Sequence, residues 1–330
     1  MNTIPEKMNA VVVHNNSVII KEIGTPHIGE TEILVRVHAC GMNRADLGIA
    51  AGAKHGSVGG DGTVVGMEWA GDVVALGAKV PNGLKLGDRV MCSGQAAFAE
   101  YAACDYGRAM KMPENMAFDT ACTLPIALQT MHQAIVSAGK FESGQSVLIQ
   151  GASSGVGLMG LQIAKALGAS KVIGTSTHPQ RREALKQFGA DLALDSNDPL
   201  WVAQVQDATQ GGVDLIVDMI SGKLVNQSLA ATKILGRIVN VGRLGGSQDV
   251  FDFDLHALRR IDYVGVTFRT RSIVEIRQIV SDVQRDLYDL IVSGALQMPV
   301  DKKFDLSAAA EAFEHMKSNR HFGKIVLQVA

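Results

Sequence analysis

The stretch SVLIQGASSGVG, residues Ser146–Gly157, decides the fold: an apolar strand runs into a turn of small residues. The helix-forming run Leu158–Leu167 and a second apolar strand, Lys171–Gly174, come next. Small residues let the backbone approach a pyrophosphate, and the free N–H groups and dipole of the helix start favour its negative charge. Such a turn also occurs for packing alone, but the following strand favours dinucleotide binding. The residues expected to contact the cofactor here are Ala152, Ser153, Ser154, Gly155, Val156 and Gly157.

The end of the second strand separates NADPH from NADH. Enzymes that use NAD tend to place an acidic residue there for the ribose hydroxyls, whereas residues 174–178 read GTSTH. Arg181 and Arg182 follow, and hydroxyls with a guanidinium suit a 2′-phosphate. The alternative is that these arginines only form a solvated helix face. We predict NADPH, bound here by Thr175, Ser176 and Arg181.

Along the chain, the spacing of apolar residues changes once. From about residue 120, helical stretches alternate with continuous apolar runs, the pattern of a doubly wound parallel sheet covered by helices. Up to about residue 110, short β-rich runs alternate with glycine turns and predict a folded-over β barrel. The later apolar runs are Val147–Ile149, Lys171–Gly174, Asp214–Val217 and Arg237–Val241, and the early ones include Val11–Val13, Ile33–Val37, Ala70–Leu76, Arg89–Cys92 and Tyr101–Cys104.

Length and charge limit the function classes. A chain of 330 residues favours two domains, one of which can interrupt the other. The net charge of −2 provides no cationic field for nucleic acid or anionic lipid, so we expect a small-molecule partner, no nucleic acid and no membrane. The segment Met1–Asn9 shows no targeting pattern, which makes the cytoplasm the expected location. The cysteines, which form no CxxC pair and are expected to be core thiols, are Cys40, Cys92, Cys104 and Cys122.

Several segments together resemble the medium-chain dehydrogenase/reductase superfamily, and within it the zinc-free quinone oxidoreductases. The resemblance implies an α/β fold in which a doubly wound Rossmann domain, residues 122–267, is inserted in a split, GroES-like β-barrel catalytic domain, residues 1–121 and 268–330. It also implies an active site in the cleft between the domains. The matching segments are Asn43–Leu47, Gly66–Gly71, Gly87–Val90, Thr123–Pro125 with Thr130, Gly151–Gly157 and Gly323–Leu327.

The same resemblance argues against a metal. Zinc-dependent members bind their catalytic ion with a Cys and a His at places that hold Asn43 and Met67 here, and an amide and a thioether are poor zinc ligands. Glu68 alone cannot hold the ion, and the proton-relay hydroxyl is replaced by Ala45. We therefore predict no zinc, and reduction of a quinone or an α,β-unsaturated carbonyl, whose hydride adduct is a delocalised oxyanion.

Further site residues follow from the resemblance, each with a structural alternative. Asn43 is expected to lie beside the nicotinamide and donate to a substrate carbonyl, or to cap the next helix. Thr130 is expected to touch the nicotinamide, or to bond its own helix backbone. Many quinone reductases hold the adenosine phosphate with a Tyr where this chain has Ser196. The remaining candidates for cofactor contact are the strand end Val241, Gly242 and Arg243, and the cleft segment Phe268 and Arg269, with an ordinary loop or exposed edge as the alternative.

Two other functions remain open at this level. An enoyl-thioester or alkenal double-bond reductase would use the same scaffold. A protein that binds NADPH but has a nucleic-acid-binding or structural role is the non-enzymatic alternative, which the near-neutral charge disfavours. The family commonly pairs through edge strands, so we expect a homodimer with Phe251–Tyr263 supplying the edge.

Overall fold

The computed structural model describes residues 3–56 and 58–329. The first two residues of the segment Met1–Asn9 lie outside this range. Residue contacts divide the chain into two units. The first unit comprises Met1–Ile126, Phe268–Tyr288 and Met298–Ala330, and the second comprises Ala127–Thr267 and Asp289–Gln297.

These boundaries differ from the expected ones in two places. The first division falls after Ile126 rather than after residue 121, and it lies inside the helix α3, Pro125–His132. The segment Asp289–Gln297 belongs to the second unit rather than to the first. Its attachment has a clear cause, because the Gln162 side chain donates to the Gln297 carbonyl (2.8 Å) and accepts from the Gln297 N–H (2.8 Å).

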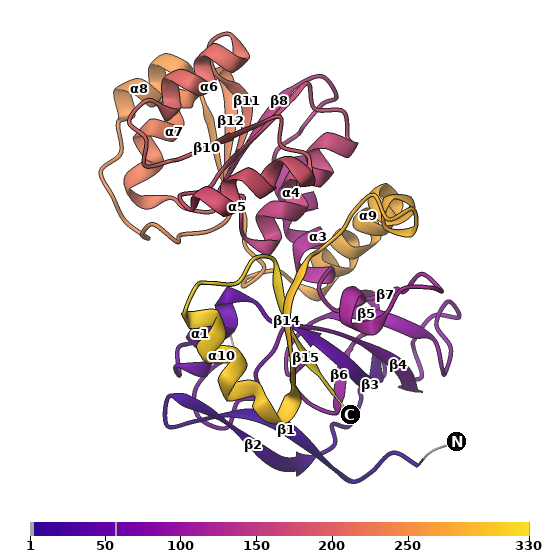
Figure 1. Ribbon diagram of the computed structural model, residues 1–330. Helices are drawn as coiled ribbons and strands as arrows, with labels where there is room; N and C mark the ends of the chain where they lie inside the picture. The colour runs from indigo at the N-terminus through magenta and orange to yellow at the C-terminus, as the bar shows by residue number, and fades with distance from the viewer. Residues whose placement is uncertain (1–2, 57, 330) are drawn as a thin grey trace. The chain divides into compact units, whose positions relative to one another are not determined.

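The second unit contains the predicted doubly wound sheet. In the described residues six parallel strands have the order β10-β9-β8-β11-β12-β13, which is the Rossmann order 3-2-1-4-5-6 (Figure 1). The prediction of this fold class is confirmed. The strands are β8 Ser146–Gln150, β9 Lys171–Thr175, β10 Leu192–Leu194, β11 Val213–Asp218, β12 Thr232–Asn240 and β13 Asp262–Gly265.

Helices cover both faces of this sheet, as the continuous apolar runs of its central strands require. On one face Leu148 and Ile216 share a core cluster with Trp201 of α6 and Leu229 of α7. On the other face α4 lies over Ile149, since a Cβ added to Gly160 would come within 3.4 Å of that side chain. Besides most of α3, the α-helices of this unit are α4 Gly155–Ala166, α5 Pro179–Ala184, α6 Trp201–Thr209, α7 Val225–Ala231 and α8 Phe253–Arg259.

The segment Phe251–Tyr263, expected to supply an edge strand, is mostly helix α8. Asp252 caps this helix by accepting from the Leu255 N–H (2.8 Å). Phe251 and Leu255 lie four residues apart and both pack against the core of the second unit. The edge strand itself is the short β13, which contains only the last two residues of the expected segment.

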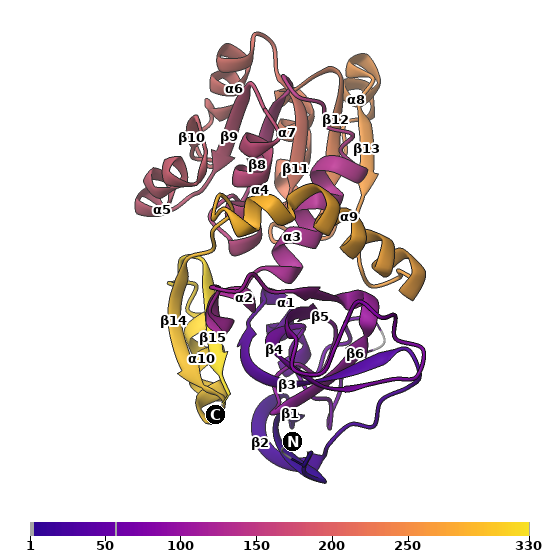
Figure 2. The same cartoon turned by 90° about the vertical axis from the view of Figure 1, so that its right-hand side faces the viewer.

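In the first unit the N-terminal and C-terminal parts of the chain share one sheet. The described residues form seven strands, in the order β14-β15-β3-β4-β5-β7 with β6 paired to β3, and β1 and β2 form a separate hairpin (Figure 2). The predicted split domain is thereby confirmed. The strands are β1 Lys7–His14, β2 Ser17–Gly24, β3 Glu32–Gly41, β4 Glu68–Leu76, β5 Arg89–Ser93, β6 Tyr101–Asp105, β7 Ala109–Lys111, β14 Val300–Asp305 and β15 Lys324–Gln328. The helices are α1 Arg44–Ala50, α2 Phe118–Ala121, α10 Ala309–Lys317 and most of α9, Ile273–Val292.

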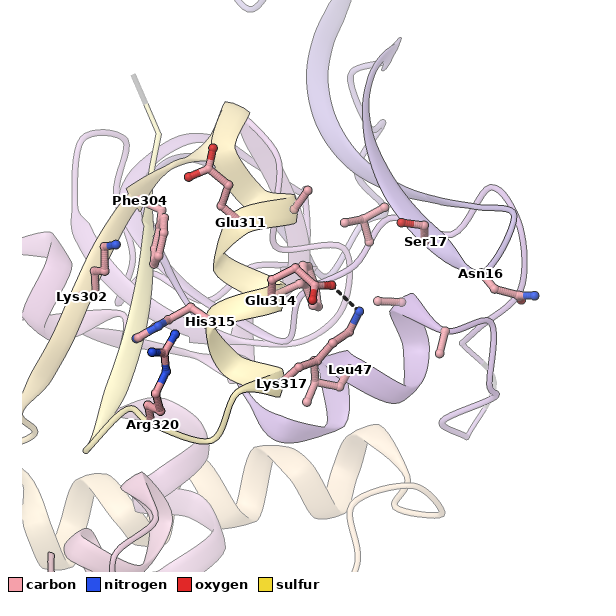
Figure 3. A pocket seen from close by; sticks show the side chains of 15 residues that line it. Asn16, Ser17, Leu47, Lys302, Phe304, Glu311, Glu314, His315, Lys317 and Arg320 are labelled. Carbon is pink, nitrogen blue, oxygen red and sulfur yellow. Dashed lines mark hydrogen bonds and ion pairs between the residues drawn. The ribbon is translucent and has the colours of Figure 1, made fainter.

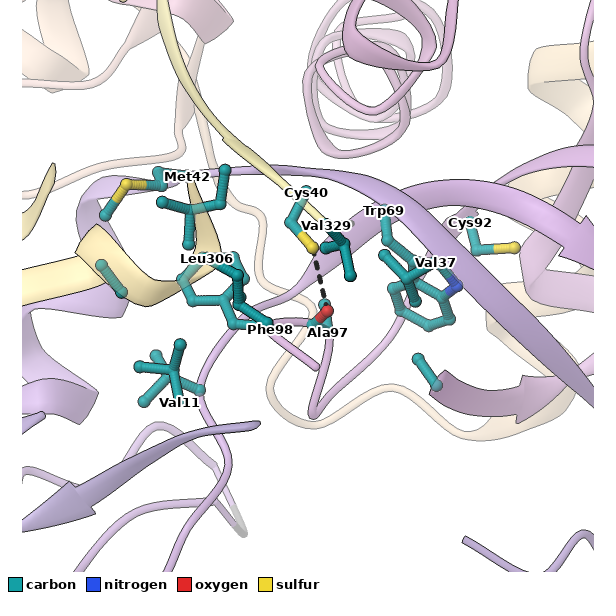
Figure 4. Packing of buried hydrophobic residues seen from close by; sticks show 14 of the residues in the cluster. Val11, Val37, Cys40, Met42, Trp69, Cys92, Ala97, Phe98, Leu306 and Val329 are labelled. Atoms are coloured by element: carbon teal, nitrogen blue, oxygen red, sulfur yellow. Dashed lines mark hydrogen bonds between the residues drawn. The ribbon is translucent and has the colours of Figure 1, made fainter. Parts of the chain in front are cut away.

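The core of the first unit contains several of the cysteines. Cys40 and Cys92 pack among apolar side chains such as Trp69 and Phe98, and the Cys40 thiol donates to the Ala97 carbonyl (3.0 Å; Figure 4). All four cysteines are buried, as predicted, and burial raises the pKa values of Cys40, Cys92 and Cys122. Among the described helices, none is long and apolar enough to cross a bilayer.

Candidate functional site

The dinucleotide turn follows the carboxyl end of β8. Gly151 has φ +71°, which permits the reversal, and the Ser154 hydroxyl accepts from the Gly157 N–H (3.1 Å) and caps α4. A Cβ on Gly157 would lie 2.7 Å from the Ala152 Cα, so the start of the helix rests directly on the backbone of the turn. A cradle of this kind fits a pyrophosphate at the amino end of a twelve-residue helix.

The predicted hydroxyls at the end of β9 hold this turn in place. The Thr175 hydroxyl donates to the Gln150 side chain (2.7 Å) and accepts from the Gly151 N–H (3.0 Å). The Ser176 hydroxyl donates to the Ser153 hydroxyl (3.1 Å). Thr175 and Ser176 are both buried. The contacts of Thr175 support the turn, and the Ser176–Ser153 pair brings two hydroxyls together at the carboxyl end of β9.

The two arginines of α5 have different environments. The Arg182 guanidinium donates to the Ser176 carbonyl (2.9 Å) and pairs with Asp195 (3.0 Å), directly after β10. Arg181 is partly exposed. Asp195 is a residue that the sequence analysis missed. It is a carboxylate near the predicted 2′-phosphate place, and Arg182 balances its charge.

The strand end Val241–Arg243 packs against the end of β11. The Asp218 carbonyl accepts from the N–H groups of Val241 (2.8 Å) and Gly242 (3.1 Å). A Cβ on Gly242 would lie 2.5 Å from the Met219 carbonyl oxygen, which gives this glycine a packing role. Burial raises the pKa of Asp218, while the N–H groups of two following residues donate to its carboxylate. Arg243 lines a small recess of about 180 Å³ here, with Ser221, Asn240 and Tyr263.

In the first unit Asn43 occupies the N-cap position of α1, but its amide does not cap the helix. The Asp46 carboxylate instead accepts from the Asn43 N–H (2.7 Å). The Asn43 amide accepts from the Lys324 ammonium (2.7 Å) and donates to Glu68 (2.9 Å). The expected donation from Asn43 to a substrate therefore competes with an internal partner.

Glu68 and Lys324 complete a buried polar cluster around Asn43. Glu68 is fully buried, forms an ion pair with Lys324, and accepts from the Ile126 N–H (2.9 Å). Lys324 also donates to the Met42 carbonyl (3.3 Å). Burial raises the pKa of the Asp46 carboxyl to about 7, against the opposing effects of the Asn43 N–H and the Lys324 charge. The sequence analysis did not assign Lys324 a role.

The other predicted residues lie in separate places. Thr130 is buried in α3, in the second unit. Phe268 and Arg269 follow β13 and belong to the first unit, where the Arg269 backbone lies against Gly56. Nearby Arg271 pairs with Glu275 (2.7 Å).

The part of the chain that the structure describes has no candidate metal site. Over residues 3–56 and 58–329, no group of three or more His, Cys, Asp or Glu side chains is placed to hold a metal ion.

A recess of about 510 Å³ lies between α1, the β1–β2 hairpin, α10 and β14 (Figure 3). Its charged lining residues include Lys302, Glu314, Lys317 and Arg320, and none of the predicted site residues lines it.

Family comparisons agree with this architecture. Residues 29–114 match the alcohol dehydrogenase GroES-like domain, and residues 155–285 match the zinc-binding dehydrogenase model. A Rossmann-type sheet inserted in a GroES-like unit defines a class of oxidoreductases that use a nicotinamide cofactor. The chain belongs to the medium-chain dehydrogenase/reductase superfamily.

Individual relatives differ in what they share with this chain. The highly reducing polyketide synthase claI of Penicillium crustosum is 30% identical over 305 residues, which is 90% of this chain but 12% of that protein. The chain thus spans a small part of the length of the curated relatives it matches. A probable oxidoreductase from Mycobacterium abscessus is 27% identical, with a TM-score of 0.85 and coverage of 98% of this chain and 99% of that one. A quinone oxidoreductase from Pseudomonas syringae shares the fold at 22% identity, with a TM-score of 0.86 and coverage of 97% and 99%.

Proposed function

We propose that this protein is an NADPH-dependent reductase that transfers hydride to a quinone or an α,β-unsaturated carbonyl compound without zinc. The observation that carries the proposal is the cluster of Asn43, Glu68 and Lys324. The amide, carboxylate and ammonium bind one another in a buried cluster, and by the resemblance Asn43 stands at the position of a zinc-ligating Cys. This donor set does not fit zinc, because the carboxylate is already paired with a cation and the amide is a poor ligand.

A reaction without a Lewis acid suits acceptors that stabilise their own negative charge. When bound, the reduced nicotinamide supplies the hydride. Addition to the β-carbon of an enone gives an enolate, and addition to a quinone gives a hydroquinone anion, which water protonates. The Gly151–Gly157 turn binds the pyrophosphate, and the free N–H groups of α4 orient it. The protein thus contributes mainly proximity and orientation.

The preference for NADPH rests on Arg181. Arg182 is held by Asp195 and the Ser176 carbonyl, and in this proposal the partly exposed Arg181 of α5 binds the 2′-phosphate. We expect Arg181→Ala to weaken NADPH binding by about tenfold to a hundredfold, the effect of losing a charge-assisted hydrogen bond, and to leave NADH binding nearly unchanged. Titration of both cofactors by protein fluorescence measures the two dissociation constants.

A neighbouring lysine provides the control for this change. Lys186 is exposed, pairs with Glu183 (2.9 Å), and lies shortly after α5. Lys186→Ala also removes one positive charge, and it should not change the affinity for NADPH relative to that for NADH. If Arg181→Ala weakened the binding of NADPH and of NADH equally, Arg181 would not be the residue that binds the 2′-phosphate.

A second candidate substrate class has a specific observation in its favour. The relative from Penicillium crustosum is a highly reducing polyketide synthase, and the match covers most of this chain. An enoyl-thioester or alkenal substrate is therefore the alternative. NADPH oxidation measured side by side with a quinone, an enone, an alkenal and an enoyl thioester separates these classes by their kcat/KM values. Tight NADPH binding without turnover of any of them would favour the non-enzymatic role.

We also propose that the protein is a homodimer that pairs through β13. The segment that precedes this edge strand carries exposed apolar side chains, which include Val250, Phe253 and Leu258. An open edge beside an apolar surface is a template for a second copy. We expect light scattering after gel filtration to give twice the chain mass, and Phe253→Asp to give the mass of one chain. A single-chain mass for the unaltered protein would refute the pairing.

A further inference from the structure

The recess between α1, the β1–β2 hairpin, α10 and β14 has walls that are fixed to one another (Figure 3). The Arg44 guanidinium at the start of α1 donates to the Asn319 side chain just after α10 (2.7 Å). His315 of α10 pairs with Asp301 of β14 (2.7 Å). A Cβ on Gly52, directly after α1, would lie 2.5 Å from a side-chain oxygen of the β1–β2 turn. The volume between these walls, about 510 Å³, lies in the range of small-molecule sites.

Part of the lining of this recess is apolar. Val18 of β2, Ala50 of α1 and Phe313 of α10 are buried side chains that line it, and Leu47 of α1 is half-buried. Covering such side chains gains free energy only for the hydrocarbon part of a ligand. A ligand that fits this recess therefore carries a hydrocarbon group.

The charged lining side chains are not balanced. Lys302 of β14 and Arg320 after α10 line the recess, and within the described part of the chain neither of them forms an ion pair. Glu311 is a lining carboxylate that likewise has no ion pair in that part of the chain. Lys317 and Glu314 pair with each other (2.5 Å). Two cations thus stand against one carboxylate, which leaves the recess with an unbalanced positive charge.

We propose that this recess is a further binding site, which takes a monocarboxylate with an unbranched hydrocarbon chain of medium length. The carboxylate pairs with Lys302 and Arg320, and the chain covers the apolar side chains of α1, β2 and α10. None of the residues expected to contact the cofactor lines the recess, and this inference does not rest on the proposed reductase function.

The shape and charge of the recess support this class of ligand. Figure 3 shows the lining residues spread from Lys302 and Arg320 on one side to Ser17 on the other, which suits an extended chain. A single negative charge matches the unbalanced positive charge. The second charge of a phosphate monoester would have no cation of its own and would be repelled by Glu311.

Titration of the whole protein with acetate, hexanoate and octanoate, followed by calorimetry, tests the hydrocarbon part. Each methylene that is buried should tighten binding by about threefold, so octanoate should bind roughly tenfold more tightly than hexanoate, and acetate should not bind measurably. 1-Octanol has the chain without the charge, and it should bind about tenfold more weakly than octanoate. Equal affinities of octanoate and 1-octanol, or of octanoate and hexanoate, overturn the proposal, as does a lack of octanoate binding at millimolar concentrations.

Three variants test whether the ligand lies in this recess. Lys302→Gln/Arg320→Gln should weaken octanoate binding by about tenfold and leave 1-octanol binding unchanged. Lys303→Gln is the control, because the side chain of this neighbouring residue points to the other face of β14 and pairs with Asp119. It should bind octanoate like the unaltered protein. Ala310→Trp fills the recess from an exposed position on α10, so it should fold normally and lose the binding of both probes. Undiminished octanoate binding by the double variant or by Ala310→Trp overturns the assignment.

Discussion

Replacing Gly157 by alanine is expected to reduce NADPH affinity by about tenfold or more and to destabilise the fold by about 1–3 kcal/mol, the usual cost of overpacking. The added Cβ would lie 2.7 Å from the Cα and 2.8 Å from the carbonyl oxygen of Ala152. These are backbone atoms, so they can move away only if the turn opens. An opened turn no longer presents its N–H groups to the pyrophosphate.

Gly160→Ala in the same helix is the matched control. Its Cβ would meet the Met131 sulfur at 2.7 Å, which is the flexible part of a side chain. We expect a small loss of stability and unchanged NADPH affinity. Isothermal titration with NADPH and thermal unfolding measure both effects. Wild-type affinity in Gly157→Ala would mean that the turn does not bind the pyrophosphate.

The second large effect is expected at Lys324. Lys324→Met leaves Glu68 buried without its cation, and breaking a buried ion pair in this way costs about 3–5 kcal/mol of the free energy of unfolding. Glu68 keeps its hydrogen bonds from the Asn43 amide and the Ile126 N–H, but neither of them supplies a counter-charge.

A second change in the same variant distinguishes this cause from a packing defect. Lys324→Met/Glu68→Gln removes both charges and should recover most of the lost free energy of unfolding at neutral pH. Urea denaturation of the wild type and of both variants across a range of pH values measures the recovery. A double variant as unstable as the single one would show that lost packing, not the unpaired carboxylate, causes the effect.

The sequence predicted the features that depend on local pattern. The apolar runs from Val147–Ile149 onward indicated a doubly wound parallel sheet, and the small residues of Gly151–Gly157 identified the turn. The segment after Phe251 was assigned to an edge from the family resemblance, without regard to its capping signal. Asp252 and the spacing of Phe251 and Leu255 favour a helix, and the structure has α8 there.

The interactions that the sequence did not predict join distant segments. Lys324 meets Glu68 only because β15 and β4 flank β3, and nothing near Lys324 in the sequence marks it as buried. Asp195 pairs with Arg182 because β10 lies beside β9. In both cases the signal in the sequence is a single charged residue next to an apolar strand. Its partner can be named only when the order of the strands is known.

Zinc-free hydride transfer is tested most directly in protein that has been treated with a metal chelator. NADPH that carries deuterium on the reactive face of its nicotinamide is mixed with a quinone or an enone, and the product is examined by mass spectrometry and NMR. We predict that the enone product carries deuterium at its β-carbon and that chelation leaves the rate of NADPH oxidation with either acceptor unchanged. No deuterium at that carbon, or a rate that chelation abolishes and zinc restores, would contradict zinc-free hydride transfer.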